Sequence, residues 1–333
     1  MTGRAWLDGW RRVVGAPAVI AGIFLITLLA AAPLAALMRN AMSEDLGASL
    51  AADEAADAVN YDWWQEFSSR AGAGTLSSTF TPSILGFAIT LDAVSSLMDE
   101  RPLAPAVTFA LAFYGLAWMF VQGGILDRLA RGRRIGAYGF FAAAGTFFFR
   151  FVRLAIAAAI VYWFLFSYVH DWLFARWYTS VTRDLAVERT AFYWRVLMYA
   201  IFAALLAMAT LIFDYAKVRA VVEDRRSMLG ALSAAIRFIG RHPARVGGVF
   251  AMNVVLLLAV IAVWAAIAPG AGGSGLSMWA GIAVSQCYIL ARLIVKLQVL
   301  ASETALFQHS LAHWGYTANP VATPPQPPIV ESL

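Results

Sequence analysis

The stretch from Val246 to Ala291 contains no charged side chain, and only one turn signal, residues 269–275, interrupts it. An α-helix rises 1.5 Å per residue, so about 20 apolar residues cross the roughly 30 Å hydrocarbon core of a bilayer. This stretch therefore predicts two transmembrane helices joined by a short turn. The chain as a whole is 61% hydrophobic and 14% charged, whereas soluble domains average about 25% charged residues. The sequence predicts a polytopic, all-α membrane protein.

Six apolar stretches of this chain are long enough to span a bilayer. They are residues 13–38, 103–126, 151–169, 196–213, 246–268 and 276–300. Arg11 and Arg12 precede the first stretch, which is longer than the 7–15 apolar residues of a secretory signal, so we expect it to be retained. These features predict one transmembrane helix bundle over residues 1–316, followed by a Pro-rich tail, residues 317–333, that we expect to be disordered.

The distribution of Lys and Arg predicts the orientation of the bundle. Sixteen of these residues fall on the side of the N-terminus and seven on the opposite side. Because basic residues accumulate in cytoplasmic segments, both termini are predicted to be cytoplasmic, in a multi-pass protein of a bacterial inner membrane. The bilayer is then the first partner of the chain, and anionic lipids are candidates at the basic segments.

Several segments outside the six spans have amphipathic patterns. The outer segment, 39–101, is acidic, and Thr81 precedes a helical apolar stripe at residues 84, 87, 91, 94 and 98. That stripe predicts a helix on the bundle or on the outer leaflet, with a further span as the alternative. On the inner side, 135–149 and 227–239 are predicted to be interfacial helices against the inner leaflet.

Four charged residues lie at or near the inner ends of the predicted spans, and their position within or beside the membrane requires an explanation. Arg292 and Lys296 lie one turn apart within the sixth span, while Asp127 and Asp214 end the second and fourth spans. Charges inside a membrane are costly and often functional, so the four form a candidate site for an ion, a proton or an anionic lipid. The alternative, which we favour, is that Arg292 and Lys296 reach lipid phosphates and each Asp caps a helix end beside its own basic neighbours.

Other candidate sites are weaker. His309 and His313 have a spacing that can bind a metal on a helix, but no further ligand completes such a site. Asp62 and Glu66 flank Trp63 and Trp64, a pattern more typical of an interfacial anchor than of a catalytic carboxylate pair. Cys287 is the one cysteine and excludes an internal disulfide. We find no catalytic motif and expect no cofactor.

An offset of 87 residues relates Asp127 to Asp214 and Arg150 to Arg237, and each of these arginines precedes a Phe. Each half then has the order span, Asp, basic stretch, interfacial helix, Arg-Phe and next span. This order is consistent with a parallel internal repeat, but matching offsets over so few positions arise more readily by chance.

Three short strings carry resemblances to known proteins. Residues 59–64 (VNYDWW), 213–219 (FDYAKVR) and 223–227 (EDRRS) resemble those of uncharacterised bacterial six-helix membrane proteins, which implies a fold but no activity. The chain is also similar to the membrane domain of some glycerophosphodiester phosphodiesterases, but we expect no catalytic domain after Leu333. Asp224, Gly230 and Pro243 have the spacing of the coupling loop of ABC importer permeases, which implies ATPase docking. Arg225 and Arg226 stand where that loop has two alanines, a departure that argues against such docking.

Two functional interpretations follow from these patterns. The first is a non-enzymatic accessory, scaffold or assembly protein that binds a membrane protein partner and no nucleic acid. The second is a transporter or lipid-handling protein, such as an ABC-permease-like subunit, that works through Asp127, Asp214, Arg292 and Lys296. An enzyme is the least supported reading, because no acid–base or nucleophile constellation can be named.

Overall fold

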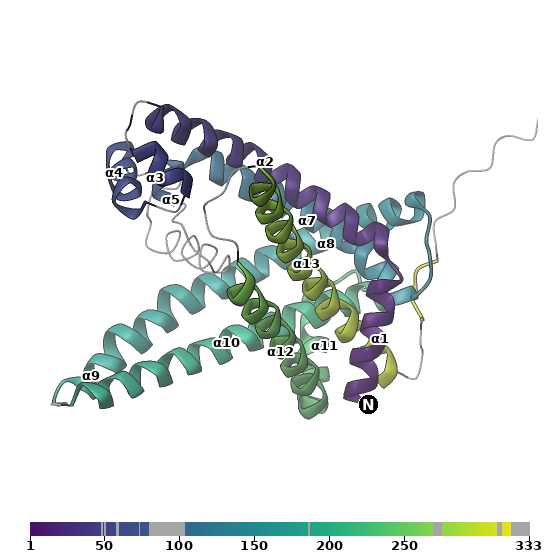
Figure 1. Ribbon diagram of the computed structural model, residues 1–333. Helices are drawn as coiled ribbons and strands as arrows, with labels where there is room; N and C mark the ends of the chain where they lie inside the picture. Colours follow the sequence, from purple (N-terminus) through teal and green to yellow (C-terminus); the bar gives the residue numbers. More distant parts are fainter. Residues whose placement is uncertain are drawn as a thin grey trace, which may run out of the picture. The chain divides into compact units, whose positions relative to one another are not determined.

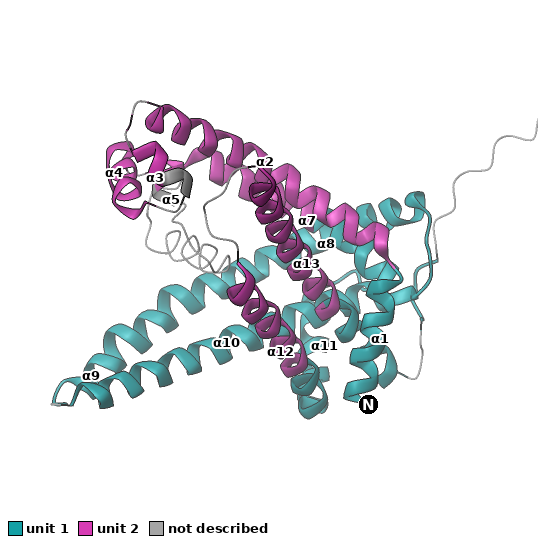
Figure 2. Ribbon diagram, in the orientation of Figure 1, with its two compact units in different colours: residues 1–15, 119–249, 300–333 teal, residues 16–118, 250–299 magenta. Residues whose placement is uncertain are grey.

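The computed structural model describes residues 1–47, 49, 51–57, 60–72, 74–79, 104–185, 187–268, 275–311 and 315–320. The regular structure of these residues is helical, and none of them lies in a strand (Figure 1). The chain divides into two compact units (Figure 2). Unit 1 comprises residues 1–15, 119–249 and 300–333, and unit 2 comprises residues 16–118 and 250–299. The all-α class predicted from the sequence is confirmed for the described residues.

Six of the helices are long and apolar enough to cross a membrane, as predicted. They are α2 (Pro17–Leu46), α7 (Pro105–Arg131), the helix that starts with α8 (Ala137–Phe164) and runs to Thr182, α10 (Glu188–Val222), α12 (Pro243–Ile267) and α13 (Leu276–Ser310). Pro17 and Pro243 occupy the first turns of their helices, where the missing N–H of proline leaves no hydrogen bond unmade. These six helices indicate a multi-pass membrane protein.

Two of these helices, α7 and α10, continue past the charged residues at which the apolar stretches end. The predicted second span ends before Asp127, but α7 continues to Arg131, and the predicted fourth span ends before Asp214, but α10 continues to Val222. Each extension contains ion pairs one turn apart, Asp127 with Arg131 and Arg219 with Glu223. Such pairs stabilise a helix after its apolar pattern has ended.

The third long helix differs from its prediction. The sequence predicted an interfacial helix over 135–149 and a separate span over 151–169, because Arg150 and Arg153 lie between the two. The structure shows one continuous helix from Ala137 to Thr182, in which η1 (Leu165–His170) and η2 (Trp172–Tyr178) are π-helical and α9 (Thr179–Thr182) is the last turn. No break is needed at Arg150, because its guanidinium is bound by Asp224 of the same unit.

Within unit 1, this helix and α10 run side by side as a long hairpin (Figure 1). Leu173 from η2 and Met198 and Phe202 from α10 are buried between them. The rings of Phe166 and His170 each lie 5.2 Å, centroid to centroid, from the ring of Phe202. The His170 ring also lies 4.5 Å from the ring of Phe174. Aromatic packing therefore holds the π-helical part of the hairpin together.

The short helix α11 (Met228–Arg241) is amphipathic as predicted, but its apolar face does not contact lipid. Ser227 caps its N-terminus by accepting a hydrogen bond from the Gly230 N–H at 3.2 Å. Its apolar residues pack inward against α10; the buried ones are Met228, Ala231, Ala234, Ala235, Phe238 and Ile239. The prediction that this face lies on the inner leaflet is therefore wrong, since the rest of unit 1 covers it.

Unit 2 contains a group of short helices that follows α2. It consists of α3 (Ala51–Asp57), α4 (Tyr61–Ala71) and α5 (Leu76–Thr79). Asn60 caps α4 by accepting a hydrogen bond from the Trp63 N–H at 2.9 Å. Trp63 and Phe67 are buried and their rings stack at 5.2 Å. The helix predicted over residues 81–99 lies outside the described residues.

The start of the predicted disordered tail differs from expectation. The Ala318 N–H donates to the Val222 carbonyl at 2.9 Å, and the Asn319 carbonyl accepts a hydrogen bond from Arg131. Residues 317–320 therefore belong to unit 1. The Pro-rich residues 321–333 lie outside the described residues.

Candidate functional site

Asp127 and Asp214, two members of the predicted charge cluster, both lie in unit 1 and each has a local basic partner. The Asp127 carboxylate is buried and lies 2.8 Å from Nε of Arg131, one turn later on α7. Asp214 lies 2.5 Å from Nζ of Lys217, on α10. Both carboxylates are thus neutralised within their own helices.

Beside Asp214 lies a polar side chain that the sequence did not single out as a site residue. Glu303 of α13 is 2% exposed and interacts electrostatically with Asp214 and Lys217. Its Oε2 atom and the hydroxyl of buried Tyr215 have no hydrogen-bond partner among the described residues. Glu303 belongs to a run of buried polar residues on α13; the others are Gln298, Ser302, Thr304 and Gln308.

Arg292 and Lys296, the other two members of the cluster, lie in unit 2 and contact aromatic rings. The Lys296 ammonium lies 3.4 Å from the ring centroid of Trp118 and 5.6 Å from that of Tyr114. The Arg292 guanidinium lies 5.6 Å from the ring of Tyr288, which stacks on Trp264. Cation–π contacts of this kind stabilise a charge by up to about 2 kcal/mol where water is excluded. The pairing of these two cations with Asp127 and Asp214 stays a prediction.

The most extensively bonded charge of unit 1 is Arg12, in α1 (Thr2–Val14). Arg12 is 3% exposed. Its guanidinium donates to Asp8 Oδ2 at 2.8 and 3.1 Å, to the Leu129 carbonyl at 3.0 Å and to Gln308 Oε1 at 2.7 Å. Gln308 in turn donates to the carbonyls of Ala130 and Tyr316, each at 2.9 Å. Burial lowers the pKa of Arg12 and Asp8 opposes that effect, yet a guanidinium stays protonated at neutral pH. One arginine thus joins α1 to the ends of α7 and α13.

A second ionic network joins α10 to α8. Arg150 of α8 lies 2.6 Å from Asp224 Oδ1 and also donates to the Arg225 carbonyl at 3.2 Å. Glu223 accepts hydrogen bonds from Arg219, at 2.7 and 3.1 Å, and from Arg225. Burial raises the pKa of Glu223, but the hydrogen bonds and charges of the two arginines outweigh burial, so the pKa lies below its ordinary value of 4.5.

The lowered pKa of Glu223 predicts a pH-dependent contribution to stability. A carboxylate with a depressed folded-state pKa stabilises the fold above its unfolded pKa, and that contribution is lost as pH falls through the folded value. We therefore expect the wild type to unfold at a higher temperature than Glu223→Gln at pH 6, and this difference to shrink below about pH 4. Thermal unfolding in detergent between pH 3 and pH 7 measures it. A difference that is constant over this range would contradict the assignment.

The histidine candidates are only partly described. His309 Nε2 lies 3.6 Å from the Asp8 carboxylate, which also binds Arg12, and His313 lies outside the described residues. Among the described residues, no group of three or more His, Cys, Asp and Glu side chains could hold a metal ion.

The proposed repeat does not place its two arginines alike. Arg150 is half-buried and binds Asp224, whereas Arg237 is exposed and makes no ion pair with a described residue. The interfacial helix of the second half, α11, is separate from α12, whereas the corresponding part of the first half is continuous with its span.

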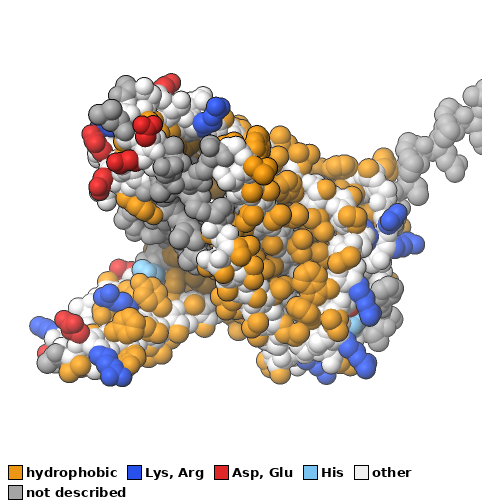
Figure 3. Space-filling view, viewed as in Figure 1, with side chains coloured by type: hydrophobic (Ala, Val, Ile, Leu, Met, Phe, Trp, Pro, Cys, Tyr) orange, Lys and Arg blue, Asp and Glu red, His pale blue; other side chains and the backbone are white. Residues whose placement is uncertain are grey.

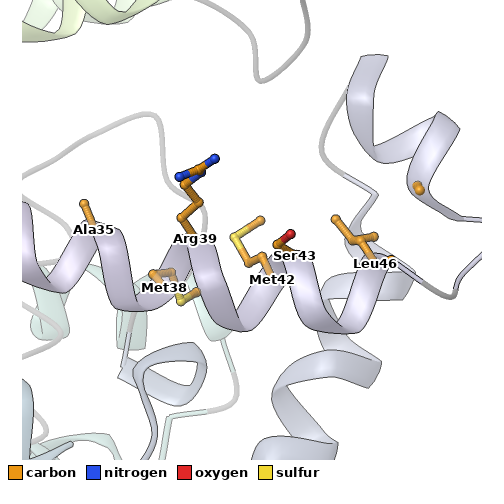
Figure 4. A pocket seen from close by; sticks show the side chains of 8 residues that line it. Ala35, Met38, Arg39, Met42, Ser43 and Leu46 are labelled. Carbon is orange, nitrogen blue, oxygen red and sulfur yellow. The ribbon is translucent and has the colours of Figure 1, made fainter.

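Two cavities lie in unit 2, where α2 ends and the short helices begin. The first, about 650 Å³, is lined mainly by apolar residues of α2 and α3: Ala35, Met38, Arg39, Met42, Ser43, Leu46, Gly47 and Ala52. Figure 4 shows Arg39, Met42 and Leu46 projecting from the same side of α2. The second, about 490 Å³, is polar and is lined by Asp45, Ser49, Ala51, Asn60, Asp62, Trp63, Glu66 and Arg70.

The end of α2 is fixed to α4 through one acidic residue. Asp45 accepts a hydrogen bond from Trp63 Nε1 at 2.9 Å and forms an ion pair with Arg70 at 3.0 Å. Leu46 lines the apolar cavity, and the preceding residue, Asp45, lines the polar cavity. The two cavities therefore adjoin on one ordered surface, which the sequence predicted only as an acidic outer segment.

No protein family model, curated protein or solved structure matches this chain. The resemblances to glycerophosphodiester phosphodiesterase membrane domains and to ABC permease coupling loops stay predictions. In the part of the chain that the structure describes, the regular structure is helical and includes six helices able to span a membrane, and the comparisons assign no family.

Proposed function

We propose that this protein is a non-enzymatic assembly partner in a bacterial inner membrane, and that the surface formed by the two cavities binds its partner. The proposal is carried by one observation, the apolar cavity at the end of α2, held in place by the contacts of Asp45 with Trp63 and Arg70. This hollow is wide and open on one side, a form that suits the side chains of a partner segment better than an enclosed small ligand.

The chemistry of this surface indicates what its partner presents. Met38 and Met42 line the apolar cavity, and flexible methionine side chains adapt to varied apolar groups. In the adjoining polar cavity, Arg70 forms ion pairs with Asp45 at 3.0 Å and with Glu66 at 3.7 Å, whereas exposed Asp62 forms none with a described residue. We therefore expect the partner to insert an apolar segment flanked by Lys or Arg. With both termini cytoplasmic, as the Arg distribution predicts, this surface faces away from the cytoplasm.

The test is purification of tagged protein from its host in mild detergent, followed by mass spectrometry. We expect one stoichiometric membrane protein partner with wild type, and about ten-fold less of it with the double variant Met42→Ala/Leu46→Ala, because truncating central interface residues costs more than 1 kcal/mol each. The control, Leu25→Ala/Leu29→Ala, removes exposed residues from the same helix outside the cavity. Equal recovery from both variants, or no partner in any preparation, would reject the proposal.

The alternative is transport or lipid handling through the four predicted charges. It requires Asp214→Asn and Arg292→Ala to abolish a measurable transport activity while the protein stays folded. The ion pair of Asp214 with Lys217 gives that carboxylate a structural role, and for this reason we place the alternative second.

A further inference from the structure

The charges of unit 1 are unevenly divided between its interior and its surface. Asp8, Asp127, Asp214, Glu223 and Asp224 form ion pairs with basic side chains. The other described acidic residues of unit 1 are buried Glu303 and, on the hairpin around residues 171–188, exposed Asp171, Asp184 and Glu188. A separate set of arginines is exposed and forms no ion pair with a described residue; these are Arg4 and Arg11 of α1, Arg226, Arg237 and Arg241 at or within α11, and Arg245 of α12. This set is therefore uncompensated positive charge.

Exposed apolar residues alternate with these arginines. On α1, Arg4, Leu7, Arg11 and Val14 are spaced by three and four residues, so they share one face, and Leu7 is 55% exposed. On α11, Leu229 is 75% exposed and Ile236 is 53% exposed, beside Arg237. In the space-filling view, Lys and Arg side chains lie among hydrophobic ones in the region where the chain begins (Figure 3).

The two faces belong to one ordered part of unit 1. Two consecutive residues of α13 contact one of these helices each. The Phe307 ring lies 5.2 Å from the Phe238 ring of α11, and Gln308 Oε1 accepts a hydrogen bond from Arg12 of α1. The first residues of α1 also reach α12, where a Cβ added at Gly248 would lie 2.9 Å from the Thr2 side chain. The exposed arginines of both helices are thus carried on a fixed scaffold.

We propose that the exposed faces of α1 and α11 bind the phosphate headgroups of anionic phospholipids in the adjacent leaflet. Arginine binds phosphate with two parallel hydrogen bonds, and an amphipathic helix inserts its apolar residues into the boundary between headgroups and acyl chains. A soluble polyanion would contact the arginines but would leave Leu7, Leu229 and Ile236 in water. A charged, partly apolar surface therefore favours lipid as the occupant over nucleic acid.

The test uses the full chain in nanodiscs of equimolar phosphatidylcholine and phosphatidylglycerol, with native mass spectrometry of the lipids retained after release. We expect wild type to retain phosphatidylglycerol preferentially. In the quadruple variant Arg4→Gln/Arg11→Gln/Arg237→Gln/Arg241→Gln this preference is expected to fall about five-fold or more. The matched control, Arg176→Gln/Arg183→Gln/Arg189→Gln/Arg195→Gln, removes four exposed arginines from the tip of the α8–α10 hairpin and is expected to keep the preference.

Three outcomes would overturn the proposal. They are an unchanged preference in the α1–α11 variant, an equal loss in both quadruple variants, and specific binding of a single-stranded RNA probe that the α1–α11 variant abolishes. Leu7→Gln/Leu229→Gln, which keeps every charge, is a second variant and is expected to lower total lipid retention. Because this test does not involve the cavities of unit 2, its failure would leave the proposed partner binding intact.

Discussion

Replacing Arg12 with alanine is expected to lower the free energy of unfolding by about 3–5 kcal/mol, the largest effect of any single substitution proposed for this chain. The guanidinium makes four hydrogen bonds with three residues of unit 1, and it is almost completely buried. Without it, the buried Asp8 carboxylate loses its paired cation and Gln308 Oε1 loses its donor. Thermal or denaturant unfolding in detergent, followed by tryptophan fluorescence, measures the loss.

Arg11→Ala is the matched control for this prediction. Arg11 is the neighbouring residue of the same helix, but it is exposed and forms no ion pair with a described residue. Its loss is expected to change stability by less than about 0.5 kcal/mol. Arg12→Lys keeps the charge but cannot supply the same planar fork of donors, so we expect an intermediate effect. Similar destabilisation by Arg11→Ala and Arg12→Ala would show that the buried network contributes nothing specific.

Gly124→Ala is expected to destabilise the packing of α7 on α8 by about 1–3 kcal/mol. A Cβ atom at Gly124 would lie 2.7 Å from the Phe140 carbonyl oxygen and 2.9 Å from the Phe140 ring, closer than atoms can approach. Because the nearest atom is backbone, no side-chain rotation relieves the contact. Small residues permit this close approach of helices in membrane proteins generally.

The same helix offers a control with the opposite expected sign. At Gly115 an added Cβ meets no described atom within 4 Å. Gly115→Ala is therefore expected to leave stability unchanged or to raise it by up to about 1 kcal/mol, because alanine favours the helix. Midpoints of thermal unfolding for the two variants, measured in one detergent, check the pair. A stabilising Gly124→Ala would contradict the close approach of α7 and α8.

The short-range ion pairs of this protein were visible in the sequence, but their importance was not. Asp8 with Arg12 and Asp127 with Arg131 are spaced by four residues, which is a helical spacing. In the sequence alone Arg12 serves only as a charge that sets orientation. Its two remaining hydrogen bonds go to residues 117 and 296 positions away, and no local pattern specifies them.

The prediction for α11 also shows that a local sequence pattern does not specify which distant residues a side chain contacts. A stripe of apolar residues determines that a helix has one face that avoids water, and the sequence located that face correctly. Lipid and a protein interior are both apolar, so the stripe cannot distinguish them. Only the packing of α11 on α10 shows that protein covers Phe238 and Ile239, leaving Leu229 and Ile236 exposed.

The sequence by itself determined the all-α class, the number of long apolar helices and the approximate position of all but the third, because hydropathy and helical length depend on neighbouring residues. The tertiary structure decided which charges are bound and which are exposed. Arg150 and Asp224 lie 74 residues apart and meet only because α8 and α10 pack together. The arginines left unpaired by such contacts define the surface of α1 and α11, since a charge is available to a ligand only when the fold has not already neutralised it.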